Sequence, residues 1–107
     1  MIEEIKKVYY EINNDFIQKT PFNTQQVRHE TIQKILLHLE SVFTDDYVFR
    51  VLCDETNNTP EIIDNNQLIA RVEWRLRKRS EEAIDYIELT FGDVDVVWET
   101  KNKNKDE

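Results

Sequence analysis

Residues 53–66 read CDETNNTPEIIDNN and separate two segments of alternating apolar residues, 47–53 and Leu68–Leu76. The alternation predicts two β-strands, so the polar stretch is a connection of about a dozen residues, longer than most hairpin loops. Asn, Asp and Thr side chains hydrogen-bond nearby backbone, and a proline fixes one φ angle, so we expect a structured loop. Any left-handed turn in it should fall on an Asn or Asp, because the loop contains no glycine. The residues expected to shape the loop are Asp54, Asn57, Asn58, Pro60 and Asp64.

Two helices are expected before these strands. Apolar residues at positions 2, 5, 9, 12 and 16 step by three and four, which predicts a helix that ends before Pro21. Asn23 is expected to cap the second helix, with Gln26 at its N3 position. The second helix is expected to bury Val27, Ile32, Ile35, Leu36, Leu39, Val42 and Phe43, and to expose Arg28, Glu30, Lys34 and Glu40.

The rest of the chain predicts more strands. Residues 86–91 alternate with Ile87, Leu89 and Phe91 on one side, and residues 94–98 alternate again after Gly92 as a short fourth segment. Helices followed by strands predict an α+β domain, with two N-terminal helices packed on a mainly antiparallel sheet of three or four strands. Residues 1–99 are expected to form a single domain, and residues 100–107 a disordered charged tail.

Composition argues against several classes of function. The net charge of −8 disfavours a general affinity for nucleic acid or for anionic membranes, since both are polyanions. Cys53 is the single cysteine, which excludes an intramolecular disulfide and a cysteine metal cluster. No stretch approaches the roughly 20 apolar residues of a membrane span, and the N-terminus does not read as a signal peptide. We therefore expect no membrane partner and a cytoplasmic site of synthesis.

Catalysis and metal binding find little support. The loop gathers carboxylate and amide oxygens, but Thr59 and Asn65 stand where an EF-hand loop requires Gly and Glu. His29 and His38 lie nine residues apart, a spacing that matches no metal pair, and Cys53 is expected in the core without a base beside it. We expect no catalytic residue, no metal, no cofactor and no enzymatic activity.

Two segments are candidate interaction surfaces. Arg71, Arg75, Arg77 and Arg79 form a basic patch, which suits either nucleic acid or an acidic partner such as another copy of the chain. Residues 94–98 are short and apolar on one face, so they either finish the sheet of their own chain or add to the exposed edge of a neighbour's sheet. The residues of this candidate strand arm are Val94, Val96, Val97 and Trp98, and the arm as a whole is placed at residues 93–99.

A family resemblance connects these features. Residues 50–66, RVLCDETNNTPEIIDNN, closely resemble the C-terminal domain of tail sheath proteins of contractile phage tails and related injection machines, which carry a similar run between two strands. Pro21-Phe22-Asn23 is loosely similar to the family's Phe-Glu-Pro-Asn helix start, with a different order, and residues 84–91 resemble its last core strand. The resemblance covers roughly residues 2–99.

The resemblance implies a structural protein of the virion tail, made in the cytoplasm of the host bacterium. Its implied partners are further copies of the chain, or tail sheath, tube or baseplate proteins. In that family the arms of neighbouring subunits add strands to this domain, so residues 94–98 are the candidate donated arm. The edge of strand 47–53 or of strand Leu68–Leu76 is the candidate receiver. Sheath proteins are several times longer and carry outer domains, so the chain is expected to be a minimal sheath-like protein, one that initiates or terminates a sheath, or an excised fragment of a longer protein. The alternative is a small nucleic-acid-binding regulator that uses the basic patch.

Overall fold

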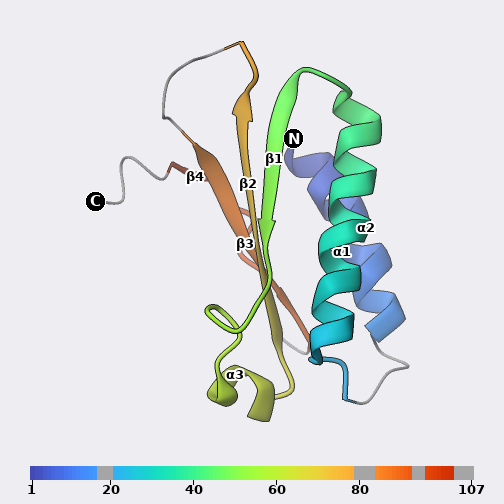
Figure 1. Cartoon of the computed structure of the whole chain (residues 1–107), viewed down its shortest axis with the longest axis vertical. Helices are drawn as coiled ribbons and strands as arrows, with labels where there is room; N and C mark the ends of the chain where they lie inside the picture. Colours follow the sequence, from blue (N-terminus) through green and yellow to red (C-terminus); the bar gives the residue numbers. More distant parts are fainter. Residues whose placement is uncertain (17–20, 79–83, 93–95, 103–107) are drawn as a thin grey trace.

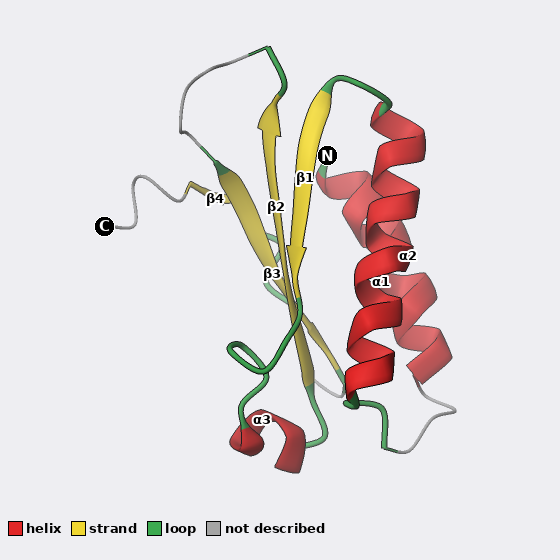
Figure 2. Cartoon of the chain, in the orientation of Figure 1, coloured by secondary structure: helices red, strands yellow, loops and turns green. Residues whose placement is uncertain are grey.

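The computed structural model describes residues 1–16, 21–78, 84–92 and 96–102. The elements in chain order are α1 (Ile2–Phe16), α2 (Gln25–Phe43), β1 (Tyr47–Leu52), α3 (Pro60–Asp64), β2 (Leu68–Leu76), β3 (Asp85–Phe91) and β4 (Lys101–Asn102). The strands form one antiparallel sheet in the order β1-β2-β3-β4. Helices α1 and α2 pack together on one side of the sheet (Figures 1 and 2). The predicted α+β class and the two-layer arrangement are therefore confirmed.

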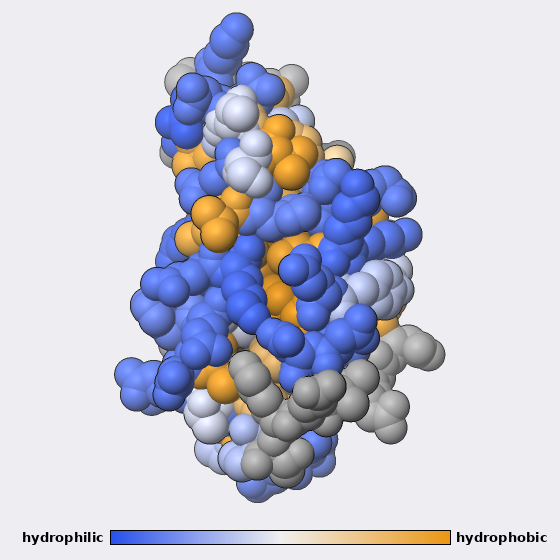
Figure 3. Space-filling model, turned by 90° about the vertical axis from the view of Figure 1, so that its right-hand side faces the viewer, coloured by the Kyte–Doolittle hydropathy of each residue, from blue (hydrophilic) through white to orange (hydrophobic). Residues whose placement is uncertain are grey.

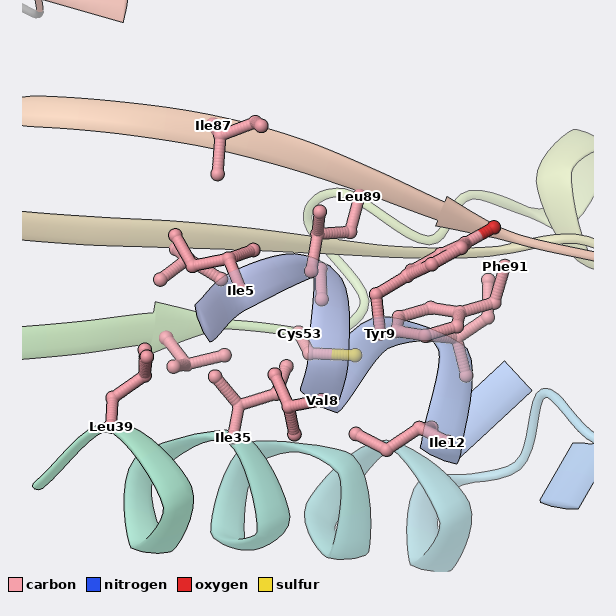
Figure 4. Close-up of a cluster of buried hydrophobic side chains, with 14 of the residues drawn as sticks. Ile5, Val8, Tyr9, Ile12, Ile35, Leu39, Cys53, Ile87, Leu89 and Phe91 are labelled. Carbon is pink, nitrogen blue, oxygen red and sulfur yellow. The ribbon is translucent and has the colours of Figure 1, made fainter. Parts of the chain in front are cut away.

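The core lies between the two long helices and the inner face of the sheet. Leu68, Ala70 and Val72 of β2 are fully buried, as the alternation predicts for a central strand with one covered face. Figure 4 shows side chains of α1, among them Ile5 and Tyr9, between the sheet and α2. The Tyr9 ring stacks on Phe91 with ring centroids 4.7 Å apart. Burial of this continuous apolar cluster is the main force that holds helices and sheet together.

The start of α2 differs from the prediction by one residue. Thr24 is the N-cap, and its side chain accepts a hydrogen bond from the Val27 amide at 3.2 Å. Asn23 is buried instead and makes contacts far along the chain, so its side chain is not available to cap the helix. The predicted exposure of Arg28 is also wrong, because its guanidinium is buried and donates to Asn23 Oδ1 at 2.7 Å. The opposite error occurs at Val42, which is exposed near the end of α2.

The fourth strand lies later in the sequence than predicted. Residues 96–100 have no strand structure, and β4 is Lys101–Asn102, inside the segment expected to be a disordered tail. Pairing with β3 forms there, and Asn102 Nδ2 donates to Asp85 Oδ1 at 3.0 Å. Val94 and residues 103–107 lie outside the described residues.

Candidate functional site

The connection between β1 and β2 is organised around the side chain of Asn58. This residue is only 2% exposed. Its Nδ2 donates to the carbonyl of Ile69 at 2.9 Å, and its Oδ1 accepts from the amide of the same residue at 2.8 Å. The register of β1 with β2 ends at Leu52 opposite Arg71, so Ile69 has no partner from the β1 backbone. The Asn58 amide thus takes the place of a β1 residue and extends the pairing of β2 beyond the last residue of β1.

Neighbouring polar residues fix the loop that carries Asn58. Asn57 Nδ2 donates to the carbonyl of Leu52 at 2.8 Å, and its Oδ1 accepts from the Asp54 amide at 3.0 Å. Asp54 Oδ1 accepts from both the amide and the hydroxyl of Thr56, at 2.8 and 2.5 Å, and these bonds hold the pKa of Asp54 below its usual value. Side-chain-to-backbone bonds therefore hold the loop, as the sequence predicted.

The second half of the connection is a short helix that was not predicted from the sequence. Thr59 caps α3 by accepting from the Ile62 amide at 3.4 Å, and Pro60 occupies its first turn. A threonine cap followed by proline and an acidic residue is a helix-start pattern, so the signal was present in the sequence. Asp64, the last residue of α3, is exposed. Asn66 then adopts a φ of +57°, which confirms that the left-handed turn falls on an Asn.

The loop network continues into the start of α2. Asn23 Nδ2 donates to Asn58 Oδ1 at 3.1 Å and to the carbonyl of Gln67 at 2.7 Å, while Asn23 Oδ1 accepts from Arg28. A buried polar chain therefore joins α2, the loop and β2. Such a chain fixes the relative positions of these elements, because an unpaired buried polar group is costly.

A groove lies between the start of α2 and the residues that follow β1. Its volume is about 670 Å³, and its lining includes Arg28, His29, Cys53 and Asp54. Burial raises the pKa of the Cys53 thiol to about 12, so Cys53 is a protonated core residue rather than a nucleophile at neutral pH. Among the described residues, no group of three or more His, Cys, Asp or Glu side chains is placed to hold a metal ion.

The two edges of the sheet differ. On the described part of the chain β1 pairs only with β2, so the other edge of β1 is free. β2 is paired on both sides, which rules it out as the receiver of an added strand. Of the two receivers that the sequence suggested, only β1 has a free edge. Arg50, near the middle of β1, is exposed.

The described part of the candidate strand arm, residues 96–99, is folded onto its own chain in this structure. Val96 and Trp98 pack against the core cluster, and Val97 is 69% exposed. Trp98 lies against two tyrosines of α1, with ring centroids 5.2 Å from Tyr9 and 6.0 Å from Tyr10. The segment leads into β4, so it runs along the β3 side of the sheet, away from the free edge of β1.

The arginines of the basic patch differ in their exposure and in their contacts. The Arg71 guanidinium lies 3.6 Å above the Tyr86 ring, and its Nε is 3.0 Å from Glu73 Oε2. Glu73 is buried, so this face of β2 is not uniformly exposed to solvent. Arg77 is exposed and donates to the carbonyl of Asp45 at 2.9 Å, Arg75 is half-buried, and Arg79 lies outside the described residues. The patch is thus partly engaged in contacts within its own chain.

The outer face of the helices is mainly hydrophilic. Figure 3 shows this face with a narrow hydrophobic strip between polar side chains. Two polar contacts connect α1 and α2 here: an ion pair of Lys34 with Asp15 at 2.6 Å, and a hydrogen bond between His38 Nε2 and Glu4 Oε2 at 3.0 Å. None of the helices in the described ranges combines the length and the apolar character that a membrane span requires.

Comparison with known proteins finds a partial similarity. No family model matches the chain, and no solved structure matches it significantly. The tail sheath protein of Enterobacteria phage T4 is 33% identical to the chain over 82 residues. This match covers 77% of the chain but only 11% of the length of the sheath protein. The chain is therefore similar to a short part of a phage tail sheath protein, in agreement with the resemblance carried by residues 50–66.

Proposed function

We propose that this protein is a non-enzymatic structural component of a contractile phage tail, built into the virion after synthesis in the host cytoplasm. The similarity to the T4 tail sheath protein carries the proposal.

The proposed mode of assembly is strand exchange with neighbouring subunits. β1 offers a free edge whose backbone groups suit pairing with an added strand. The Asn58 network holds β1 and β2 in a fixed relation beside that edge, so an arriving strand meets a preformed template. The candidate donor is the arm at residues 93–99. The partner is another copy or a tail sheath, tube or baseplate protein, and the protein acts as a sheath-like, initiating or terminating subunit.

The nucleic-acid alternative has weaker support. Arg71 already stacks on Tyr86 and pairs with Glu73, and Arg77 bonds the backbone of its own chain. A phosphate backbone would have to compete with these contacts and with the net charge of −8.

Electron microscopy and co-sedimentation of the protein with the sheath and tube proteins of its phage test the proposal. We expect rings, tubes or co-pelleting with sheath. A variant that lacks residues 93–107 should fold, as judged by circular dichroism, but fail to assemble. The matched control lacks only residues 103–107 and should assemble normally. A protein that stays monomeric at high concentration and ignores both sheath and tube would contradict the proposal.

A further inference from the structure

The segment 96–102 follows the edge of β3, but only part of the segment pairs with that strand. β4 pairs Lys101 with Tyr86 and Asn102 with Asp85. The same antiparallel register, continued along β3, would place Glu99 opposite Glu88 and Val97 opposite Thr90. A shallow pocket of about 250 Å³ is lined by Tyr86, Glu88, Thr90, Val97, Glu99 and Lys101. The segment is thus in position to be a strand, but only its last two residues are one.

Aromatic contacts hold the other end of this segment. Trp98 meets Tyr9 and Tyr10 at ring centroid distances of 5.2 and 6.0 Å, and Lys6 Nζ lies 5.5 Å from the Trp98 ring. Tyr10 is 53% exposed, although a tyrosine usually buries much of its ring. We call the surface formed by the β3 edge, Lys6, Tyr9 and Tyr10 the aromatic socket. It is a site for an extended segment that carries a tryptophan.

We propose that the aromatic socket is an assembly interface, and that its occupation by residues 96–102 of the same chain is the closed, unassembled state. The surface that accepts this segment within one chain fits the same segment of a second copy, with the same contacts. The inference rests on the proposed function, because it names how strand exchange is regulated.

Release of the segment has two consequences at once. It frees a strand for donation, and it uncovers the edge of β3 as an acceptor in addition to the free edge of β1. A closed copy can therefore receive a strand only on β1, whereas an opened copy both donates and receives. This coupling predicts that assembly is slow to start and then propagates from opened copies.

The cost of opening sets the concentration at which exchange occurs. A segment tethered to its own socket competes at an effective concentration of about 1 mM, so exchange in dilute solution should be rare. Subunits gathered on a growing tail would exceed that concentration locally. The free protein should thus remain closed until it meets an assembly.

Disulfide trapping tests the inference directly. Asp85 and Asn102 face each other in the register of β3 and β4, within the distance that a disulfide spans. The double variant Asp85→Cys/Asn102→Cys should close an intramolecular disulfide at about 10 µM protein, below the effective concentration of the tethered segment. The buried native Cys53 should not interfere, because burial raises its pKa to about 12.

Mixing the two single variants reports docking between chains. Asp85→Cys and Asn102→Cys chains should form mixed disulfide dimers, with a yield that rises about tenfold between about 0.1 and 1 mM protein. Glu88→Cys mixed with Asn102→Cys is the matched control, because these positions are not opposite each other, and it should give few mixed dimers. Equal yields in the two mixtures, or no mixed dimer at about 1 mM, would overturn the inference.

A second variant keeps the inference testable if the cysteine chains misfold. Trp98→Ala should speed hydrogen exchange at the β3 edge about tenfold while leaving the β1–β2 ladder protected. Unchanged protection of β3 would show that Trp98 does not hold the segment, which contradicts the closed state.

The proposed function can fail independently of this inference. The oxidised double variant should neither self-associate nor join the sheath, and reduction should restore both. Chains that exchange segments in the trapping assay but never bind sheath or tube would refute the tail function and leave the socket intact. Oxidised chains that assemble as well as reduced ones would refute the socket as a regulator.

Discussion

Truncation of Asn58 should destabilise the protein more than any other single change in the loop. In Asn58→Ala, the amide and carbonyl of Ile69 and the carbonyl of Asp54 lose hydrogen bonds of 2.8, 2.9 and 3.0 Å. Asn23 loses a bond of 3.1 Å as well. Each such bond contributes about 1 kcal/mol net, so we expect a loss of roughly 3–4 kcal/mol in the free energy of unfolding. This is a large fraction of the total for a domain of this size.

Urea unfolding followed by circular dichroism measures this loss. With an m-value of about 1.5–2 kcal/mol per molar urea, the midpoint should fall by roughly 2 M. Asn58→Asp is nearly isosteric but turns the donor that meets two carbonyls into an acceptor, so it should also be strongly destabilising. Because protonation restores a donor, its deficit should be smaller at pH 4 than at pH 8.

Asn65→Ala provides the matched control. Asn65 is an exposed asparagine in the same connection, so its replacement should change the free energy of unfolding by less than about 0.5 kcal/mol. A loss below about 1 kcal/mol in Asn58→Ala would show that water replaces the side chain at little cost, and that the loop is not held in the way argued above.

Three further predictions concern single groups. Cys53 should resist thiol reagents at pH 8 until the protein unfolds. Its pKa is raised to about 12 in the folded state only, so the thiol of the unfolded chain loses its proton at lower pH than that of the folded chain. The free energy of unfolding should therefore fall as pH rises from about 9 to 12. Thr56→Val removes the hydroxyl hydrogen bond that helps hold the pKa of Asp54 down, so the pKa of Asp54 should rise in an NMR titration. In the native protein, the stability that Asp54 gains from these hydrogen bonds is present above the usual carboxyl pKa and is lost as pH falls through the lowered value. Arg71→Ala removes the guanidinium whose Nε lies 3.0 Å from the buried Glu73 carboxylate and should cost about 2 kcal/mol in thermal unfolding, while Arg71→Lys should recover only part of it. An unchanged melting temperature would show that this ion pair does not contribute to stability.

Local sequence patterns predicted most of the secondary structure. The alternation of β2 and β3 predicted which residues face the core, and the three- and four-residue steps of α1 predicted its buried side. Both follow from backbone geometry alone, since the period of a strand or helix decides which side chains share a face. The capping pattern at Thr59 and Pro60 held the information for α3 in the same local form.

The errors share a different cause. Asn23 and Arg28 are polar residues that the sequence assigned to a cap and to solvent. Asn23 is buried against Asn58 and the carbonyl of Gln67, both distant in sequence, and Arg28 is buried against Asn23. A polar residue's preference for a cap or for water is a local average, whereas a buried hydrogen bond depends on which element lies opposite. Only the packed structure supplies that partner.

The sequence by itself determined the fold class, the structured loop and the similarity to tail sheath proteins, because these depend on periodicity, side-chain type and a specific run of residues. The tertiary structure decided where the sheet ends. Within the part of the chain that the structure describes, it left the edge of β1 free, enclosed β2, and placed residues 96–102 against α1 and β3. An amphipathic strand carries the same pattern whether it pairs with its own sheet or with a neighbour's, so only the arrangement of the edges in space separates the two.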